Sequence, residues 1–306
     1  MRKLRIATRG SKLALRQAEI VSEAIAGLRP KGSTTVELVV VETSGDLHLE
    51  RPIGEIGGQG VFVKEVERAI LDGRADLAVH SAKDLPSGTR SDGLALVAVP
   101  KRADPRDALV GLGLDDLGPG ARVATGAPRR RAQLAWLRPD LRFDELRGNI
   151  ATRLAKMPPD GAVVVAFAAL QRLGLTELAA EVLSLSTMIP QVGQGALAIQ
   201  CRSGDGPTAE LLGAIDDPDS HRCLDAERAF LAELGGGCEL PVGALAVVDD
   251  DGVVELEGVV ASPDGLVLLR KAHKGRDAFA LGRLLAREIL DRCGGAEILA
   301  GTTELV

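Results

Sequence analysis

Short apolar segments that alternate with helical segments are the feature that most limits how this chain can fold. Residues 4–8 have the composition of a buried strand, and residues 12–27 have the apolar spacing of a helix with Ser11 as N-cap. The same order recurs after residue 100, where Pro128 stands at the first position of a helix. Further strands are predicted at 35–41, 76–79, 94–99, 123–125, 141–145, 162–166 and 196–200. We therefore predict two doubly wound α/β domains.

The last third of the chain has a different pattern. A helix is predicted at 218–234, three successive strands at 242–248, 253–261 and 266–273, and an amphipathic helix at 277–293. Successive strands between helices indicate a C-terminal α+β domain with a three-stranded antiparallel sheet. The predicted domains are 1–99 with 193–214, then 100–192, then 215–306.

Composition excludes several classes of partner. The net charge is −6, and one Trp, five Phe and no Tyr leave few stacking surfaces, so nucleic acid is not expected. The longest apolar run, 162–170, is too short to span a bilayer, and the N-terminus lacks the apolar core of a signal peptide. We expect a cytoplasmic protein with no membrane segment. Four Cys without C-x-x-C spacing and four His predict neither a metal site nor disulfides.

Polar residues gather where predicted strands end. They are Arg9, Ser11, Lys83, Asp84, Thr125, Arg129, Arg130, Arg147, Asn149, Arg153 and Arg172. Ligands of open α/β sheets bind at the carboxyl ends of strands, and guanidinium groups match carboxylates in bidentate fashion. A polycarboxylate is therefore the expected ligand, although any single arginine could be a solvated surface charge.

Cys238 follows three glycines in the stretch 235–243, where the backbone can take positive φ and a bulky group can approach the sulfur. The alternative is a helix C-cap that leads into a hairpin, with Cys238 as a small buried hydrophobe.

Motifs from residue 5 to residue 243 resemble those of the porphobilinogen deaminase family, in family order and with compatible spacing. They are R-I-A-T-R-G-S-K-L-A-L-R-Q, A-V-H-S-A-K-D-L-P, D-P-R-D-A-L, P-R-R-R-A-Q-L, L-R-G-N-I-A-T-R-L, L-Q-R-L-G-L, V-G-Q-G-A-L and G-G-G-C-E-L-P-V-G. The resemblance implies that the two α/β domains are like those of type II periplasmic binding proteins and flank a cleft. It also implies hydroxymethylbilane synthase activity, a transferase reaction that joins four porphobilinogen molecules head to tail, releases ammonia, and ends in hydrolytic release of the linear tetrapyrrole.

The resemblance also implies roles for residues. A dipyrromethane cofactor would be attached through a thioether to Cys238, and Asp84, Lys83 and Arg9 would be catalytic. Cofactor binding would fall to Cys238, Ser11, Lys83, Asp84, Thr125, Arg129, Arg130, Arg147, Gly148 and Arg153. Porphobilinogen, a small-molecule substrate, would be bound by Arg9, Arg147, Arg153 and Arg172. No metal is implied, and a monomer is expected.

The chain departs from the family pattern at a few positions. Glu55 and Gln59 stand where many relatives have Lys, Ser44 replaces a frequent Arg, and Gly126-Ala127 replaces a usual Ser-Ser. We expect the glycine-rich loop 43–60 to act as a lid. The competing hypothesis is a non-enzymatic two-lobed anion-binding module, which gives no reason for the setting of Cys238.

Overall fold

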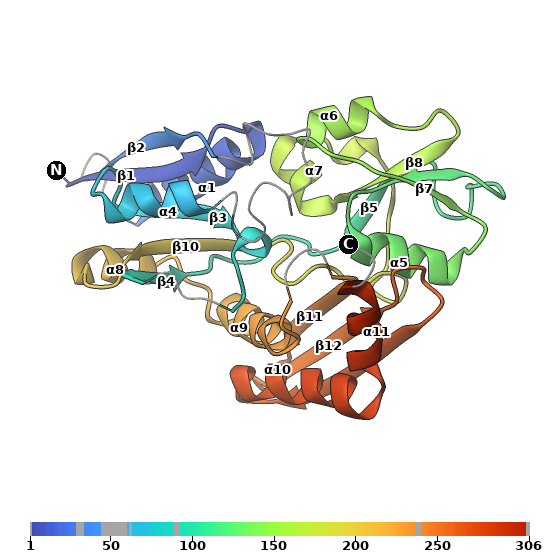
Figure 1. Ribbon diagram of the computed structural model, residues 1–306. Coiled ribbons are helices and arrows are strands. Elements are labelled where there is room, and N and C mark those ends of the chain that lie inside the picture. The colour runs from blue at the N-terminus through green and yellow to red at the C-terminus, as the bar shows by residue number, and fades with distance from the viewer. Residues whose placement is uncertain are drawn as a thin grey trace. The chain divides into compact units, whose positions relative to one another are not determined.

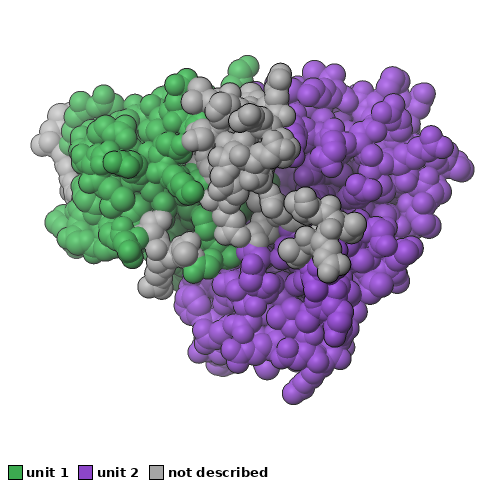
Figure 2. Space-filling model, in the orientation of Figure 1, with its two compact units in different colours: residues 1–103, 196–221 green, residues 104–195, 222–306 purple. Residues whose placement is uncertain are grey.

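The computed structural model describes residues 2–28, 34–43, 60, 63–88, 92–236 and 240–303. The chain divides into two compact units, coloured separately in Figure 2. Unit 1 comprises residues 1–103 and 196–221, and unit 2 comprises residues 104–195 and 222–306. The chain therefore passes from one unit to the other three times.

Unit 1 is built on a five-stranded sheet with the order β2-β1-β3-β10-β4 (Figure 1). Its elements are β1 (Arg2–Arg9), α1 (Lys12–Gly27), β2 (Thr34–Val41), α4 (Lys64–Leu71), β3 (Leu77–Ser81), η1 (Ala82–Asp84), β4 (Leu94–Ala98), β10 (Leu197–Arg202) and α8 (Gly206–Gly213). Strand β1 pairs in parallel with β2 and β3, whereas β10 is antiparallel to both β3 and β4. We call this sheet A.

Helices cover both faces of sheet A because side chains alternate along its strands. Leu4 and Ile6 of β1 belong to one core with Val21 of α1, and Ala7 belongs to another core with Ile70 of α4. The predicted N-cap of α1 is confirmed, since the Ser11 hydroxyl accepts a hydrogen bond from the Ala14 N–H at 3.2 Å. Strand β3 contributes Leu77 and Val79 to the first core and Ala78 to the second, so β1 and β3 are held by the same two cores.

Unit 2 contains a second five-stranded sheet, sheet B, with the order β7-β6-β8-β5-β9. Its elements are β5 (Asp107–Gly111), β6 (Arg122–Ala124), α5 (Pro128–Leu137), β7 (Arg142–Asp144), α6 (Ile150–Ala155), β8 (Gly161–Ala166), α7 (Phe167–Leu173), η2 (Thr176–Leu178) and β9 (Ala179–Val182). Strand β6 is parallel to β7 and β8, and β5 is antiparallel to β8 and β9. Sheets A and B therefore share one arrangement. Three neighbouring strands are parallel, the fourth strand is antiparallel to them, and the fifth strand is antiparallel to the fourth.

The third sheet of the chain lies in unit 2, has the order β11-β12-β13 and is antiparallel throughout. Its elements are α9 (Pro218–Glu233), β11 (Val242–Val248), β12 (Val254–Ala261), β13 (Leu268–Gly275), α10 (Ala278–Arg287), η3 (Glu288–Arg292) and α11 (Gly295–Thr303). Phe230 of α9 is fully buried in the core of this part. Gly258 of β12 makes room for it, since a Cβ there would lie 2.7 Å from the Phe230 Cζ atom.

The predicted α/β fold with a C-terminal three-stranded antiparallel sheet is confirmed. The amphipathic helix expected at 277–293 is confirmed as a helical segment, in which α10 ends at Arg287 and a turn of π-helix follows directly. The sequence analysis also missed β5, β9, α8 and α11, which are short elements beside turn residues. The predicted division into three domains stays a prediction. No helix among the residues that the structure describes is long and apolar enough to cross a membrane.

Candidate functional site

The first group of predicted residues lies at one edge of sheet A. Strands β1 and β3 are parallel, so their carboxyl ends meet at the same edge. Arg9 ends β1, Ser11 caps α1, and the turn η1 that follows β3 carries Lys83 and Asp84. Residues more than 70 positions apart in the sequence are thereby brought together in unit 1.

A small cavity in unit 1 joins several of these side chains. Its volume is about 60 Å³, and its polar lining consists of Arg9, Ser11, Gln17, His80, Ser81 and Asp84. The buried amide of Gln17 donates to the Ser81 hydroxyl at 2.8 Å, which ties α1 to the end of β3. The cavity thus offers one guanidinium group and one carboxylate among neutral donors and acceptors.

His80 is a member of this lining to which the sequence analysis gave no role. The side chain is 6% exposed, and burial lowers its pKa to about 4, with Gln200 opposing the shift and the charge of Arg9 adding to it. The ring is therefore neutral at physiological pH. The signal available in the sequence was its place in A-V-H-S-A-K-D-L-P, one residue before the end of a buried strand.

The second group of predicted residues lies at an edge of sheet B. Strand β6 is parallel to β7 and β8, so Thr125, Arg147 and the start of α7 follow strand ends at a common edge. Gly148 has φ 111°, and a Cβ there would meet the Thr152 side chain at 2.7 Å, so the turn before α6 requires glycine. Asn149 caps α6 by accepting from the Thr152 N–H at 3.0 Å.

Arg129 and Arg130 at the start of α5 are buried around a shared carboxylate. They are 3% and 4% exposed, and their Nη2 atoms each lie 2.8 Å from an oxygen of Asp107. Burial alone would raise the pKa of Asp107, but the two arginine charges and hydrogen bonds from Gln194 and Arg129 lower it to about 2. Two cations around one anion leave a net positive charge in the interior of unit 2.

Arg172, at the end of α7, is a half-buried cation. Its Nη2 atom donates to the Gly195 carbonyl at 2.7 Å, and burial lowers its pKa to about 10. No carboxylate of the described residues forms an ion pair with it. Arg153 of α6 is half-buried and donates from Nε to the Gly148 carbonyl at 2.8 Å. Arg172 therefore suits an anionic ligand, because it is desolvated and no described carboxylate pairs with it.

Glu227 is a buried carboxylate that sequence reasoning also missed. It accepts from the Gly193 N–H at 2.7 Å and from the Ala246 N–H at 2.9 Å. These bonds join the V-G-Q-G turn to strand β11 through helix α9. No local sequence signal identifies such a residue, because its partners stand 34 and 19 positions away.

Several predicted positions lie outside the described residues. They are Cys238, Ser44, Glu55, Gln59 and nearly all of the predicted lid. Gly126 is described, and a Cβ at this position would lie 2.4 Å from the Leu146 carbonyl oxygen. The glycine at this departure from the family pattern therefore permits a close backbone approach that a serine would disturb.

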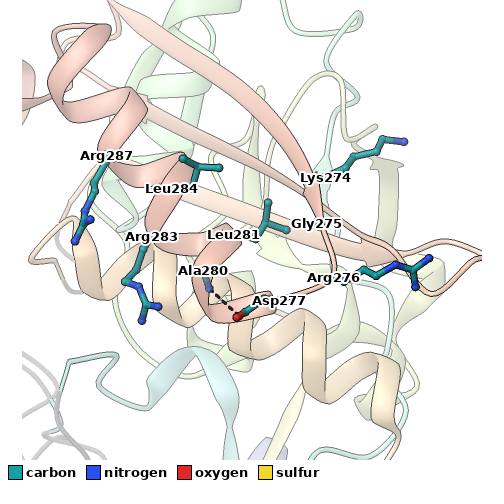
Figure 3. Close-up of a pocket in the computed structure, with 9 residues that line it drawn as sticks. All are labelled: Lys274, Gly275, Arg276, Asp277, Ala280, Leu281, Arg283, Leu284 and Arg287. Carbon is teal, nitrogen blue, oxygen red and sulfur yellow. Dashed lines mark hydrogen bonds between the residues drawn. The ribbon is translucent and has the colours of Figure 1, made fainter.

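A separate groove of about 510 Å³ lies on the C-terminal part of unit 2, beside β13 and α10 (Figure 3). Lys274 and Arg276 extend on one side of its leucines, and Arg283 and Arg287 extend on the other. Lys274 pairs with Glu255 at 3.0 Å and Arg287 with Glu233 at 2.6 Å. None of the predicted site residues lines this groove.

Comparison with known families decides between the two hypotheses. Residues 4–210 match the family model described as porphobilinogen deaminase, dipyromethane cofactor binding domain. The chain belongs to the porphobilinogen deaminase family. Residues 221–291 match the C-terminal domain of the same family. Membership indicates an enzyme of tetrapyrrole synthesis.

Relatives in the porphobilinogen deaminase family match over nearly the whole chain. A porphobilinogen deaminase of Roseiflexus castenholzii is 46% identical over 304 residues, which are 97% of this chain and 99% of that protein. One of Acidothermus cellulolyticus is 45% identical over 307 residues, covering 97% and 91%. Among solved structures, a nutrient binding protein from Burkholderia cenocepacia bound to methionine has a TM-score of 0.42 at 15% identity, covering 70% of this chain and 92% of that chain.

Proposed function

We propose that this chain is a hydroxymethylbilane synthase that condenses porphobilinogen head to tail, with Asp84, Lys83 and Arg9 at the reacting centre. The observation that carries the proposal is the family match over 4–210, within which Asp84 and Arg9 line one cavity. The reaction class is a transferase, because each cycle breaks the bond between the methylene carbon and the amine nitrogen of porphobilinogen, releases ammonia, and joins that carbon to a pyrrole carbon, which loses its proton.

Asp84 has the chemistry that the first step requires. Loss of ammonia breaks the carbon–nitrogen bond of porphobilinogen, and the bonding electron pair leaves with the nitrogen. The carbon left behind becomes positively charged, and a fixed carboxylate stabilises such a charge best where water is scarce. Asp84 follows a strand end and borders a small cavity, which keeps its position defined. Arg9 can hold a substrate carboxylate at the same edge.

The arginines of unit 2 are suited to the acetate and propionate groups of the substrate and cofactor. Arg172 is desolvated without an ion-paired carboxylate among the described residues, and the Arg129–Arg130–Asp107 cluster has a net positive charge. An anionic group would lower the electrostatic cost of the desolvated Arg172, whereas Arg129 and Arg130 are already paired with Asp107. The donor set of the chain therefore fits a polycarboxylated dipyrromethane, which would be held by Ser11, Lys83, Thr125, Arg129, Arg130, Arg147, Gly148 and Arg153.

When bound, the dipyrromethane group supplies the pyrrole carbon to which the first substrate is joined. We propose that Cys238 anchors this group through a thioether. A carbon–sulfur bond resists hydrolysis, so Cys238 would serve as an anchor through repeated cycles. Arg147, Arg153 and Arg172 would orient carboxylates of the growing product through charge-assisted hydrogen bonds.

Intact-mass measurement tests the anchor. Purified protein should be heavier than its 31.9 kDa chain by a linked pair of pyrroles, and peptide mapping should assign the addition to Cys238. Cys238→Ser should remove the added mass and most of the activity, whereas Cys293→Ser should keep both. An unmodified Cys238 in active enzyme would contradict the proposal.

We also propose that the enzyme is a cytoplasmic monomer. The proposal is consistent with a small-molecule substrate that requires no partner chain. Light scattering coupled to size-exclusion chromatography tests the monomer directly, because a dimer would double the measured mass.

A further inference from the structure

His80 is the group in the Asp84 cavity whose chemistry the proposed function leaves unused. Its ring borders the cavity, yet its Nε2 atom is fully buried and has no hydrogen bond of good geometry to any described residue. A buried polar atom without a partner is costly unless the surroundings compensate for it. Gln200 and Glu67 supply this compensation.

Gln200 of β10 is the neighbour of the buried side of the ring. Ala198 lies directly opposite His80 in the β3–β10 pairing, so Gln200 is its diagonal neighbour on the same face of sheet A. The Oε1 atom of Gln200 is also buried without a well-formed hydrogen bond, and the Gln200 side chain raises the His80 pKa against the effect of burial. An amide oxygen has this effect when it faces a ring N–H.

Glu67 of α4 determines which way the Gln200 amide points. Gln200 Nε2 donates to Glu67 Oε1 at 2.9 Å, and both side chains are buried. A carboxylate accepts hydrogen bonds and cannot donate them, so the NH₂ group of Gln200 must face Glu67. The Gln200 carbonyl is then left for His80, which must carry its proton on the nitrogen that faces it. The second ring nitrogen consequently keeps a lone pair.

The size and charge of the cavity limit what that lone pair can meet. A volume of about 60 Å³ holds a few water molecules or a small polar group such as an ammonium. The charged side chains that line the cavity with the ring are Arg9 of β1 and Asp84 of η1, and Glu67 lies behind Gln200. A neutral ring adds an acceptor there without adding a second positive charge. An ammonium group beside Asp84 fits this arrangement.

We propose that His80 is a substrate-positioning residue: the Glu67–Gln200 pair fixes its Nε2–H tautomer, and the Nδ1 lone pair accepts a hydrogen bond from the aminomethyl group of porphobilinogen beside Asp84. The inference rests on the proposed function for the identity of the substrate. The ring holds the leaving nitrogen in place, and Asp84 stabilises the charge that its departure creates.

Two substitutions separate the two ring nitrogens. The amide of Asn reaches about as far as Nδ1, and the longer amide of Gln reaches about as far as Nε2. His80→Asn should therefore keep kcat/KM within a few-fold of wild type, whereas His80→Gln and His80→Leu should lower it by about 10- to 100-fold, the range of one hydrogen bond to a charged group. His273→Asn, in the C-terminal part of unit 2, is the control and should change nothing.

Nuclear magnetic resonance of ¹⁵N-histidine-labelled protein gives a readout that is independent of turnover. His80 should show the Nε2–H tautomer and stay neutral down to about pH 4, and Glu67→Gln should mix its tautomers because a Gln–Gln pair can reverse direction. An Nδ1–H tautomer in wild type, or equal activity of His80→Gln and His80→Asn, overturns the inference. A wild-type protein without deaminase activity overturns the proposed function, and the role of His80 with it.

Discussion

Sheets A and B have the same strand arrangement, yet the residues at their carboxyl edges differ in charge. The edge of sheet A offers a carboxylate, Asp84, beside a neutral His80 and a single guanidinium group, Arg9. The edge of sheet B is followed by several arginines, of which Arg129 and Arg130 are buried against Asp107. One topology therefore carries two different charge patterns, and we propose that the edge of sheet A stabilises positive charge while arginines after sheet B bind carboxylates.

The two edges also differ in how their charges are compensated. In unit 1 the polar cavity is small, and burial keeps the titratable ring uncharged. In unit 2 two buried cations share one buried anion, and Gln194 donates to the same carboxylate at 2.9 Å. We therefore expect removal of the Asp84 carboxylate, at the edge of sheet A, to reduce catalysis most. Removal of the Asp107 carboxylate, at the start of β5 in sheet B, should reduce stability most.

The largest effect is expected at Asp84. Asp84→Asn keeps the shape of the side chain and removes the charge, so kcat should fall by about 10³-fold or more, beyond the usual loss for one electrostatic contact. Steady-state kinetics measures the loss, and thermal unfolding should be nearly unchanged. Asp72→Asn, a surface substitution in the same unit, is the matched control. A kcat within tenfold of wild type would assign the charge stabilisation to another group.

Asp107→Asn should show the opposite pattern, a loss of stability. Without the carboxylate, two buried guanidinium groups repel each other, and breaking a buried pair of this kind costs about 3–5 kcal/mol. Urea unfolding measures the change in the free energy of unfolding. Asp140→Asn removes a surface pair with Arg138 and should cost less than about 1 kcal/mol. Equal costs at both positions would show that burial of the cluster contributes nothing.

The free energy of unfolding should depend on pH through His80 of unit 1 in a different pH range from that of Asp107 of unit 2. Its pKa lies near 4 in the folded protein and near 6.5 when unfolded, so the unfolded chain binds more protons between those values. Stability should be full above about pH 6.5 and fall by roughly 3 kcal/mol as the pH drops to about 4. Asp107, whose pKa is lowered to about 2, stabilises the fold above about pH 3.8 and loses this effect only below it.

Urea unfolding at pH 7 and pH 4.5 measures this dependence. His80→Asn should remove most of the difference between the two pH values, whatever its own effect on stability at pH 7. A slope of the same size in the variant would show that His80 does not cause the loss of stability in acid.

The smallest effect is expected at Arg172. Arg172→Met should raise KM by about 10- to 100-fold with little change in kcat, since a carboxylate contact of the substrate is lost in the ground state and the transition state alike. Stability should change by only about 1 kcal/mol, because relief of the buried charge is offset by loss of the bond to the Gly195 carbonyl. Arg122→Met, which alters an exposed pair with Asp144, should leave KM unchanged.

Features that depend on neighbouring residues could be predicted from the sequence. Ser11 caps α1 as expected, and Gly174 ends α7 in the left-handed conformation at φ 67°. Both depend on side chains and backbone within one turn of helix. The predicted alternation of strands and helices likewise placed Arg9 and Asp84 at one sheet edge.

Features that depend on distant residues could not be predicted. Asp107 opens a short strand directly after a proline-containing linker, and its partners Arg130 and Gln194 stand 23 and 87 positions away. The sequence analysis therefore identified the arginines without their counter-ion. The link between Gln200 and Glu67 spans 133 positions, and the pattern of apolar residues contains no sign of it.

The position of β10 has a consequence for the order in which the protein is made. Sheet A places β10 between β3 and β4, so its interior is incomplete until residue 202 has left the ribosome. Sheet B draws all of its strands from the continuous stretch 107–182 and has no such requirement. The sheet that comes second in the sequence can therefore close first during synthesis, while the strands that carry Arg9 and the residues before Asp84 wait for their partner.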